Sequence, residues 1–96
     1  MKFSDRFAGA APAAMAMTAE IRQFAYRPSP MQVEAGAAVT WTNQDGAQHS
    51  VTHRGGAFDS GLFGQGQSYS FTFAEPGEYA YSCTRHPSTH GMVMVS

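Results

Sequence analysis

The sequence predicts an all-β protein, an antiparallel β-sandwich or barrel of about seven to eight strands. Short runs of alternating apolar and polar residues carry aromatic and β-branched side chains, as in Tyr69 to Phe73 and Tyr79 to Cys83. Gly, Pro, Asn and Asp residues that favour tight turns separate these runs. No segment has the periodicity of a helix, so the alternating strands are the main elements expected.

Each expected strand is bounded by a turn signal. Pro28 and Pro30 precede one strand, Asp45-Gly46 follows another, and Pro76-Gly77 precedes a third. The expected strands cover residues 18–24, 31–35, 37–43, 48–53, 57–60, 67–74, 78–83 and 91–96.

Length and composition point to a single packed domain. The chain has 96 residues, of which 43% are hydrophobic, with seven Phe, four Tyr and one Trp. The formal net charge of −1 and the absence of a basic stripe argue against nucleic acid as a partner. No apolar run approaches the roughly 20 residues that a membrane-spanning helix requires. Residues 1–17 are alanine-rich and lack alternation, so we expect a flexible arm or linker there and the domain over residues 18–96.

The only cysteine lies three residues before a histidine, as Cys83-Thr84-Arg85-His86 at the expected end of a strand. A thiolate and an imidazole that converge in a strand-end loop suit copper, zinc or iron. His49 is the best candidate for a third ligand, because it opens a strand after the turn at Asp45-Gly46. His53 lies on the same face, but four residues of strand span about 13 Å, so His49 and His53 cannot share an ion. His53 is therefore expected to be an exposed loop residue.

The order and spacing of five segments resemble the cupredoxins, the type 1 blue copper proteins, and especially their plastocyanin and amicyanin branch. The resemblance covers roughly residues 18–96 and implies a Greek-key sandwich with one copper ion at one end. It also implies that His49, Cys83 and His86 are the three equatorial ligands. The segments are Trp41-Thr42-Asn43 with His49-Ser50-Val51, Ala57-Phe58-Asp59-Ser60-Gly61, Tyr69-Ser70-Phe71-Thr72-Phe73, Pro76-Gly77-Glu78-Tyr79 and Cys83-Thr84-Arg85-His86-Pro87.

The sequence departs from this family at the axial position. Short-loop members carry a methionine three residues after the second histidine, and Thr89 stands there in this chain. Thr89 can occupy the axial slot without a strong bond, His90 can act as a fourth ligand, or Met92 can leave the last strand to bind. In the first case, loss of the thioether raises the reduction potential, whereas a bound water or His90 lowers it. Otherwise Met92 and Met94 are packing or surface residues of an edge strand.

The resemblance implies an electron carrier that cycles between Cu(I) and Cu(II), not an enzyme, either free or tethered to a redox enzyme. A copper-storage or delivery module and a copper site whose open axial position binds small ligands remain the alternatives. A redox protein is expected to dock near His86, beside an apolar patch drawn from Pro28, Pro30, Met31, Pro87 and either Leu62 or Phe63. Arg85 can favour an acidic partner surface. Family resemblance also implies a monomer in an extracytoplasmic, periplasmic location.

Overall fold

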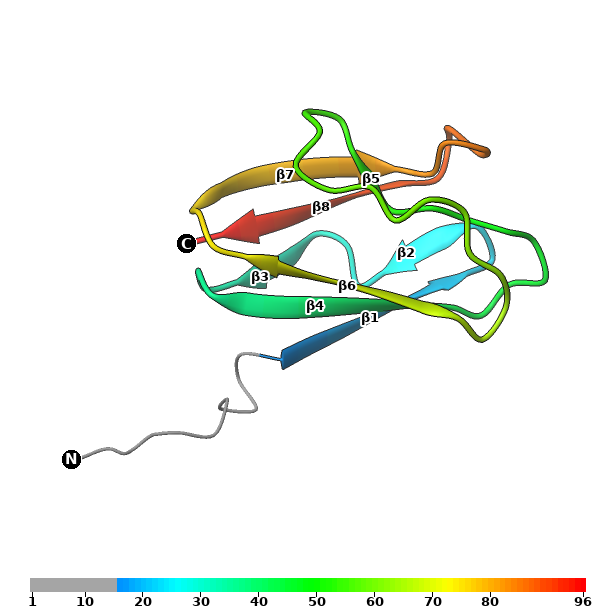
Figure 1. Ribbon diagram of the computed structural model, residues 1–96, viewed down its shortest axis with the longest axis horizontal. Helices are drawn as coiled ribbons and strands as arrows, with labels where there is room; N and C mark the ends of the chain where they lie inside the picture. Colours follow the sequence, from blue (N-terminus) through cyan, green and yellow to red (C-terminus); the bar gives the residue numbers. More distant parts are fainter. Residues whose placement is uncertain (1–15) are drawn as a thin grey trace.

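Two four-stranded sheets pack face to face in the computed structural model, which describes residues 16–96 (Figure 1). The strand order is β2-β1-β4-β6 in the first sheet and β3-β8-β7-β5 in the second. The predicted all-β sandwich is therefore confirmed. The strands are β1 (Ala16–Arg22), β2 (Ala25–Arg27), β3 (Met31–Val33), β4 (Ala37–Asn43), β5 (Thr52–His53), β6 (Ser68–Phe73), β7 (Gly77–Ser82) and β8 (His90–Val95).

Both sheets are mixed rather than purely antiparallel. β1 runs parallel to β4, and β3 runs parallel to β8, while the remaining pairs are antiparallel. An alternating pattern shows which side chains face the core, but it carries no information about the direction of the neighbouring strand. The sequence alone therefore could not distinguish these parallel pairs.

Alternation in β4 separates the core from the solvent face of the first sheet. Val39 and Trp41 are completely buried, whereas Thr40 and Thr42 point outward. The Thr40 hydroxyl lies 2.6 Å from that of Ser70 on β6, and similar hydroxyl pairing continues along the two strands. Because one face of β4 is buried, a shift of one residue against β6 would expose its core side chains, so the register of the two strands is fixed. The positions of the loops at the ends of these strands are fixed with it.

The expected strands differ from the observed ones in four places. Of the strand expected over 48–53, only β5 forms, and residues 57–60 contribute only an isolated bridge between Thr52 and Asp59. The strand predicted over 18–24 ends at Arg22. The chain then turns back and forms β2, which was not expected. β1 also begins two residues before the predicted domain boundary, at Ala16. The rest of the predicted arm, residues 1–15, lies outside the described residues.

An aromatic cluster joins the two sheets. Trp41 from β4 donates its indole N–H to the hydroxyl of Tyr81 from β7 at 3.2 Å, and both side chains are buried. Tyr26 from β2 contacts Tyr81 edge to face, with ring centroids 4.6 Å apart. Such pairs contribute about 0.5–1.5 kcal/mol each beyond their burial. The cluster leaves no room on β8 at Gly91, where a Cβ atom would lie 2.6 Å from the Tyr81 hydroxyl.

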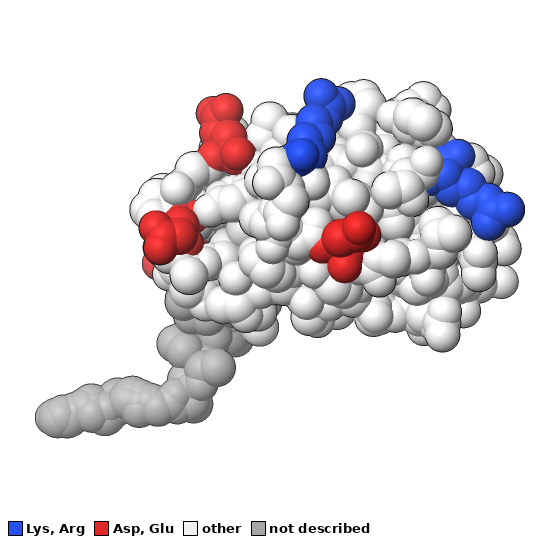
Figure 2. Space-filling view, turned by 45° about the horizontal axis from the view of Figure 1, so that its top comes forward, with Lys and Arg blue, Asp and Glu red and all other residues white. Residues whose placement is uncertain are grey.

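Charged side chains are sparse on the surface. On the face shown in Figure 2, acidic and basic residues stand apart between wide uncharged areas and form no continuous patch of one sign. This distribution agrees with the formal net charge of −1. Among residues 16–96, no helix is long and apolar enough to cross a membrane.

Candidate metal centre

Three loops meet at one end of the sandwich and bring His49, Cys83 and His86 together. These loops follow β1, β4 and β7, and they lie at the right-hand end of Figure 1. One potential ligand atom from each residue lies within 4.8 Å of the other two. The Cys83 Sγ and His86 Nδ1 atoms are 3.6 Å apart. A trigonal ion with bonds of about 2.3 Å to sulfur and about 2.0 Å to nitrogen places those atoms about 3.7 Å apart, so the spacing fits a metal.

His49 is held rigidly from both its backbone and its ring. Its N–H donates to the Phe63 carbonyl at 3.1 Å and its carbonyl accepts from Phe63 at 2.8 Å. The ring Nε2 lies 2.9 Å from Asp45 Oδ2, which leaves Nδ1 as the free ring nitrogen. This Nδ1 is buried and has no hydrogen-bond partner among residues 16–96. A buried polar atom without a partner is costly, and a metal ion beside Cys83 and His86 removes that cost.

Asp45 connects His49 to the turn between β1 and β2. Its carboxylate accepts the backbone N–H of Gln23 at 2.7 Å and that of Phe24 at 2.9 Å. Burial opposes ionisation of Asp45, but the hydrogen bonds from Phe24, Gln23 and His49 outweigh it, so the pKa of this carboxyl lies below its ordinary value. The ionised carboxylate therefore orients the imidazole and the turn at the same time.

Phe24 lies over both imidazoles and is the residue of this site that the sequence did not reveal. Its ring contacts His49 and His86 edge-on, with centroids 5.0 and 4.8 Å apart. Gln23 and Phe24 both adopt the left-handed backbone conformation, with φ of 53° and 59°. This conformation costs free energy for residues other than glycine, and the segment contains no Gly or Asn that would indicate a turn in the sequence. The contacts to Asp45 supply the compensation, and they exist only in the folded chain.

The loop that carries Cys83 and His86 is closed by backbone hydrogen bonds. The Cys83 N–H donates to the Thr89 carbonyl at 2.9 Å, and the Thr89 N–H donates to the His86 carbonyl at 2.8 Å. The Thr84 N–H donates to the Ser50 hydroxyl at 2.9 Å. Ser50, the residue after His49, is thus bonded to this loop directly. The loop that follows β4 is tied to the one that follows β7 through this contact.

The three candidates for the axial position lie in different surroundings. Thr89 is buried, and its hydroxyl donates to the Phe24 carbonyl at 2.9 Å. His90 and Met92 both line a groove outside the second sheet. His90 does not belong to the cluster of His49, Cys83 and His86.

The structure also shows where His53 and the residues of the expected apolar patch lie. His53 does not join the cluster, as expected, but it belongs to β5 and stacks on Phe58 with ring centroids 5.2 Å apart. Met31, an expected member of an apolar surface patch, is instead buried in the core, and so is Phe63, whereas its expected alternative Leu62 is exposed. Each lies next to an exposed residue, and the alternation of facing along a strand decides which of two neighbours is buried.

Comparison with known proteins agrees with this geometry. Residues 13–96 match the family described as copper-binding proteins of the plastocyanin/azurin family. The chain belongs to this family. It is 35% identical to amicyanin of Paracoccus denitrificans, over 93% of this chain and 72% of that protein. It is 33% identical to the chloroplastic plastocyanin of Tetradesmus obliquus, over 71% of this chain and 54% of that protein.

Solved structures show the same relationship. A Cu(I) form of an amicyanin variant superposes with a TM-score of 0.79 at 33% identity, covering 85% of this chain and 83% of that one. A structure described as a novel purple cupredoxin from Nitrosopumilus maritimus has a TM-score of 0.78 at 29% identity and covers 83% of this chain and 99% of that one. The family membership, together with one thiolate and two imidazoles at the end of the sandwich, establishes copper as the cofactor of this protein.

Proposed function

We propose that this protein carries single electrons through one copper ion held by His49, Cys83 and His86. The observation that carries the proposal is the buried Nδ1 of His49, which has no hydrogen-bond partner among residues 16–96 and lies in a cluster with a thiol and a second imidazole. When bound, copper supplies a one-electron couple between Cu(I) and Cu(II). Amicyanin and plastocyanin, the relatives of this chain, are electron carriers, which supports a carrier rather than an enzyme.

The residues around the three proposed ligands limit their movement. Asp45 holds the His49 ring, and Ser50 and Thr89 hold the loop on either side of Cys83. Ligands fixed by hydrogen bonds of this kind keep their positions when the charge at the centre changes. Little reorganisation accompanies each transfer, which is the property a fast electron carrier requires.

For the axial position, we propose that Thr89 occupies it without forming a strong bond. The Thr89 side chain is buried, and its hydroxyl proton is already donated to the Phe24 carbonyl. His90 and Met92 line the groove outside the second sheet, so either would need a rearrangement of the end of β8 to bind. A threonine in place of a thioether stabilises Cu(I) relative to Cu(II), and the reduction potential is expected to be high.

Optical and paramagnetic-resonance spectra of the protein loaded with Cu(II) test both proposals. We expect an intense visible band from the copper–thiolate bond, and we expect Cys83→Ser to abolish it. Thr89→Met should shift the spectrum and lower the potential, whereas a matched change outside the site, Thr40→Met, should leave both unchanged. A colourless copper-loaded protein would refute the three-ligand site. An unchanged spectrum in Thr89→Met would refute the axial role of Thr89 alone.

We further propose that electrons enter and leave through the half-buried His86 ring. Phe24 is 49% exposed beside it, Pro87 follows it in the chain, and Leu62 is 45% exposed next to Phe63, which pairs with His49. These apolar groups suit the docking of a redox protein, and a monomeric chain leaves them free. Arg85 nearby donates to Gln48 and keeps its positive charge at the rim. Substituting Leu62→Glu should slow electron transfer to a partner without changing the spectrum, and an unchanged rate would contradict this docking face.

An extracytoplasmic, periplasmic location is part of this proposal and rests on the resemblance to amicyanin. An oxidised protein found in the periplasmic fraction of the native host would support it, and recovery only from the cytoplasm would contradict it.

A further inference from the structure

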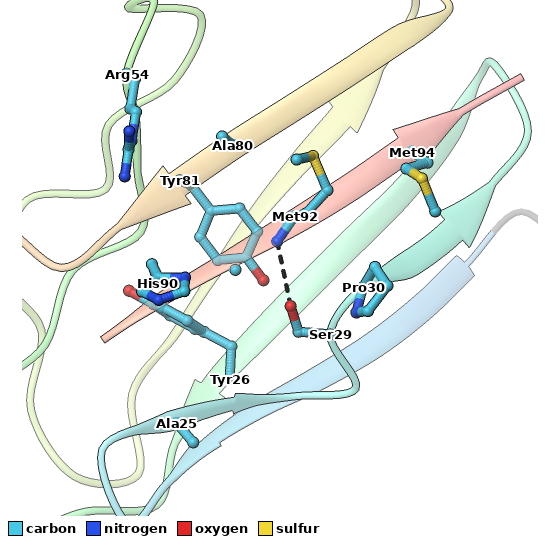
Figure 3. Close-up of a pocket in the computed structure, with 11 residues that line it drawn as sticks. Ala25, Tyr26, Ser29, Pro30, Arg54, Ala80, Tyr81, His90, Met92 and Met94 are labelled. Atoms are coloured by element: carbon cyan, nitrogen blue, oxygen red, sulfur yellow. Dashed lines mark hydrogen bonds between the residues drawn. The ribbon is translucent and has the colours of Figure 1, made fainter. Parts of the chain in front are cut away.

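A groove on the second sheet carries soft donor atoms that the copper site does not use. Figure 3 shows His90, Met92 and Met94, which all project from β8 and line the groove. Ser29 accepts the Met92 backbone N–H at 3.2 Å and closes one side of the groove. Because residues alternate along a strand, these three side chains share one face, while Gly91 and Val93 between them point into the core.

The position of β8 makes these side chains unusual. β8 lies between β3 and β7, so it is an interior strand and not the edge strand expected from the sequence. On the neighbouring strand β7, Ala80 pairs with Met92 and Glu78 pairs with Met94. Neither is large and apolar, so the thioethers are only partly covered. An interior strand with an uncovered face normally presents polar side chains there.

Thioether sulfur is a soft donor that favours Cu(I), and imidazole nitrogen is a good ligand for copper. The exposed His90 side chain lies in the same groove as Met92. Adjacent positions of this face are about 6.7 Å apart along the strand, which two ligand side chains can bridge through one ion. The guanidinium of Arg54 also lines the groove, and its positive charge disfavours a divalent ion more than a monovalent one.

We propose that this groove is a second metal site, specific for a soft monovalent ion such as Cu(I). Met92 is the common ligand, and it binds together with His90 on one side or Met94 on the other. His90 and Met94 are about 13 Å apart along the strand, so one ion does not engage both. The site shares no residue with His49, Cys83 and His86, and it does not depend on the electron-transfer function proposed above.

Cu(I) titration under anaerobic conditions tests this site. The reduced, copper-loaded protein is dialysed against Cu(I) buffered by a chromophoric chelator, and bound copper is counted. We expect two Cu(I) per chain for the natural sequence and one for Met92→Leu. His90→Ala or Met94→Leu alone should lower the affinity for the second Cu(I) about tenfold or less, because Met92 can still bind it together with the remaining partner. A natural sequence that stops at one Cu(I), or a Met92→Leu variant that still binds two, would overturn the proposal.

Two controls separate the sites. Met17→Leu changes a methionine of the other sheet and should leave the count at two. Cys83→Ser should lose the ion of the first site but keep one Cu(I), with NMR shifts of the Met92 and Met94 methyl groups on titration. If the Cu(II) spectrum fails to show a thiolate site while these methyl shifts persist, the proposed function fails and the groove site stands. If the methyl groups do not shift, the groove site fails on its own.

Discussion

Replacing Asp45 by asparagine probes the contact that joins the metal centre to the β1–β2 turn. The Asp45 carboxylate accepts three hydrogen bonds, from the Gln23 and Phe24 backbones and from the His49 ring. An asparagine side chain has one oxygen and one N–H₂ group, so at least one of these donors faces another donor. Hydrogen bonds to a charged group contribute about 1.5–3 kcal/mol each. We expect Asp45→Asn to lower the free energy of unfolding of the metal-free protein by about 2 kcal/mol.

That loss is large against the 5–15 kcal/mol typical of a small domain and corresponds to a fall of about 10 °C in Tm. Urea unfolding of the metal-free protein, followed by tryptophan fluorescence, measures it, and the slope with urea should stay unchanged. Amide hydrogen exchange of Gln23 and Phe24 should accelerate in the variant. Glu34→Gln, the same chemical change at an exposed carboxylate, is the matched control. If Asp45→Asn costs no more than this control, the carboxylate does not hold the turn and the reasoning is wrong.

Three further predictions concern the core and the loops. Burial raises the pKa of Tyr81 to about 12, so the folded state keeps a proton that the unfolded chain releases from about pH 10. Stability is present below that pH and is lost as pH rises toward 12, by about 1.4 kcal/mol at pH 11, which urea unfolding against pH measures. Gly91→Ala should cost about 1–3 kcal/mol by urea unfolding, because its Cβ would overlap the Tyr81 ring. Ser50→Ala removes the acceptor of the Thr84 N–H and should speed copper release to a chelator.

Each of these has a control. In Tyr81→Phe, the free energy of unfolding should fall less steeply as the pH rises from about 10 to 12. An unchanged fall would mean that other groups cause the loss of stability at high pH. Gly46→Ala meets no atom within 4 Å of its new Cβ and should be nearly neutral, so equal costs at both glycines would contradict the overlap. Ser68→Ala removes an exposed hydroxyl that pairs with Thr42, and it should leave copper release unchanged. Equal release rates in the two serine variants would show that Ser50 does not hold the loop.

Local patterns in the sequence were enough to predict the sandwich and the residues that meet in it. Alternation along β4, β6 and β7 follows directly from the two-residue period of a strand, so inward residues such as Trp41 and Tyr81 were predictable. The spacing of Cys83 and His86 confines both to one loop. The position of His49 after the turn at Asp45-Gly46, together with the family resemblance, indicated the third member of the cluster.

The aromatic cover of the site and the soft-donor groove could not be predicted in this way. The turn at Gln23 and Phe24 has no glycine to reveal it, and it forms because Asp45, about twenty residues later, accepts both N–H groups. Likewise, β8 is the last strand of the chain and was expected to lie at the edge of its sheet. The pairing of β3 alongside it places it inside the sheet.

The sequence by itself therefore determined which side chains of strands such as β4 and β7 face inward, which loop carries the thiolate, and which family the chain resembles, because these depend on spacing along one strand or loop. Only the tertiary structure decided the strand neighbours and their directions, the position of Phe24 over the two imidazoles, and the shared face of His90, Met92 and Met94 on an interior strand. These features depend on contacts between segments far apart in the chain, and the free energy of such contacts exists only once both segments are in place.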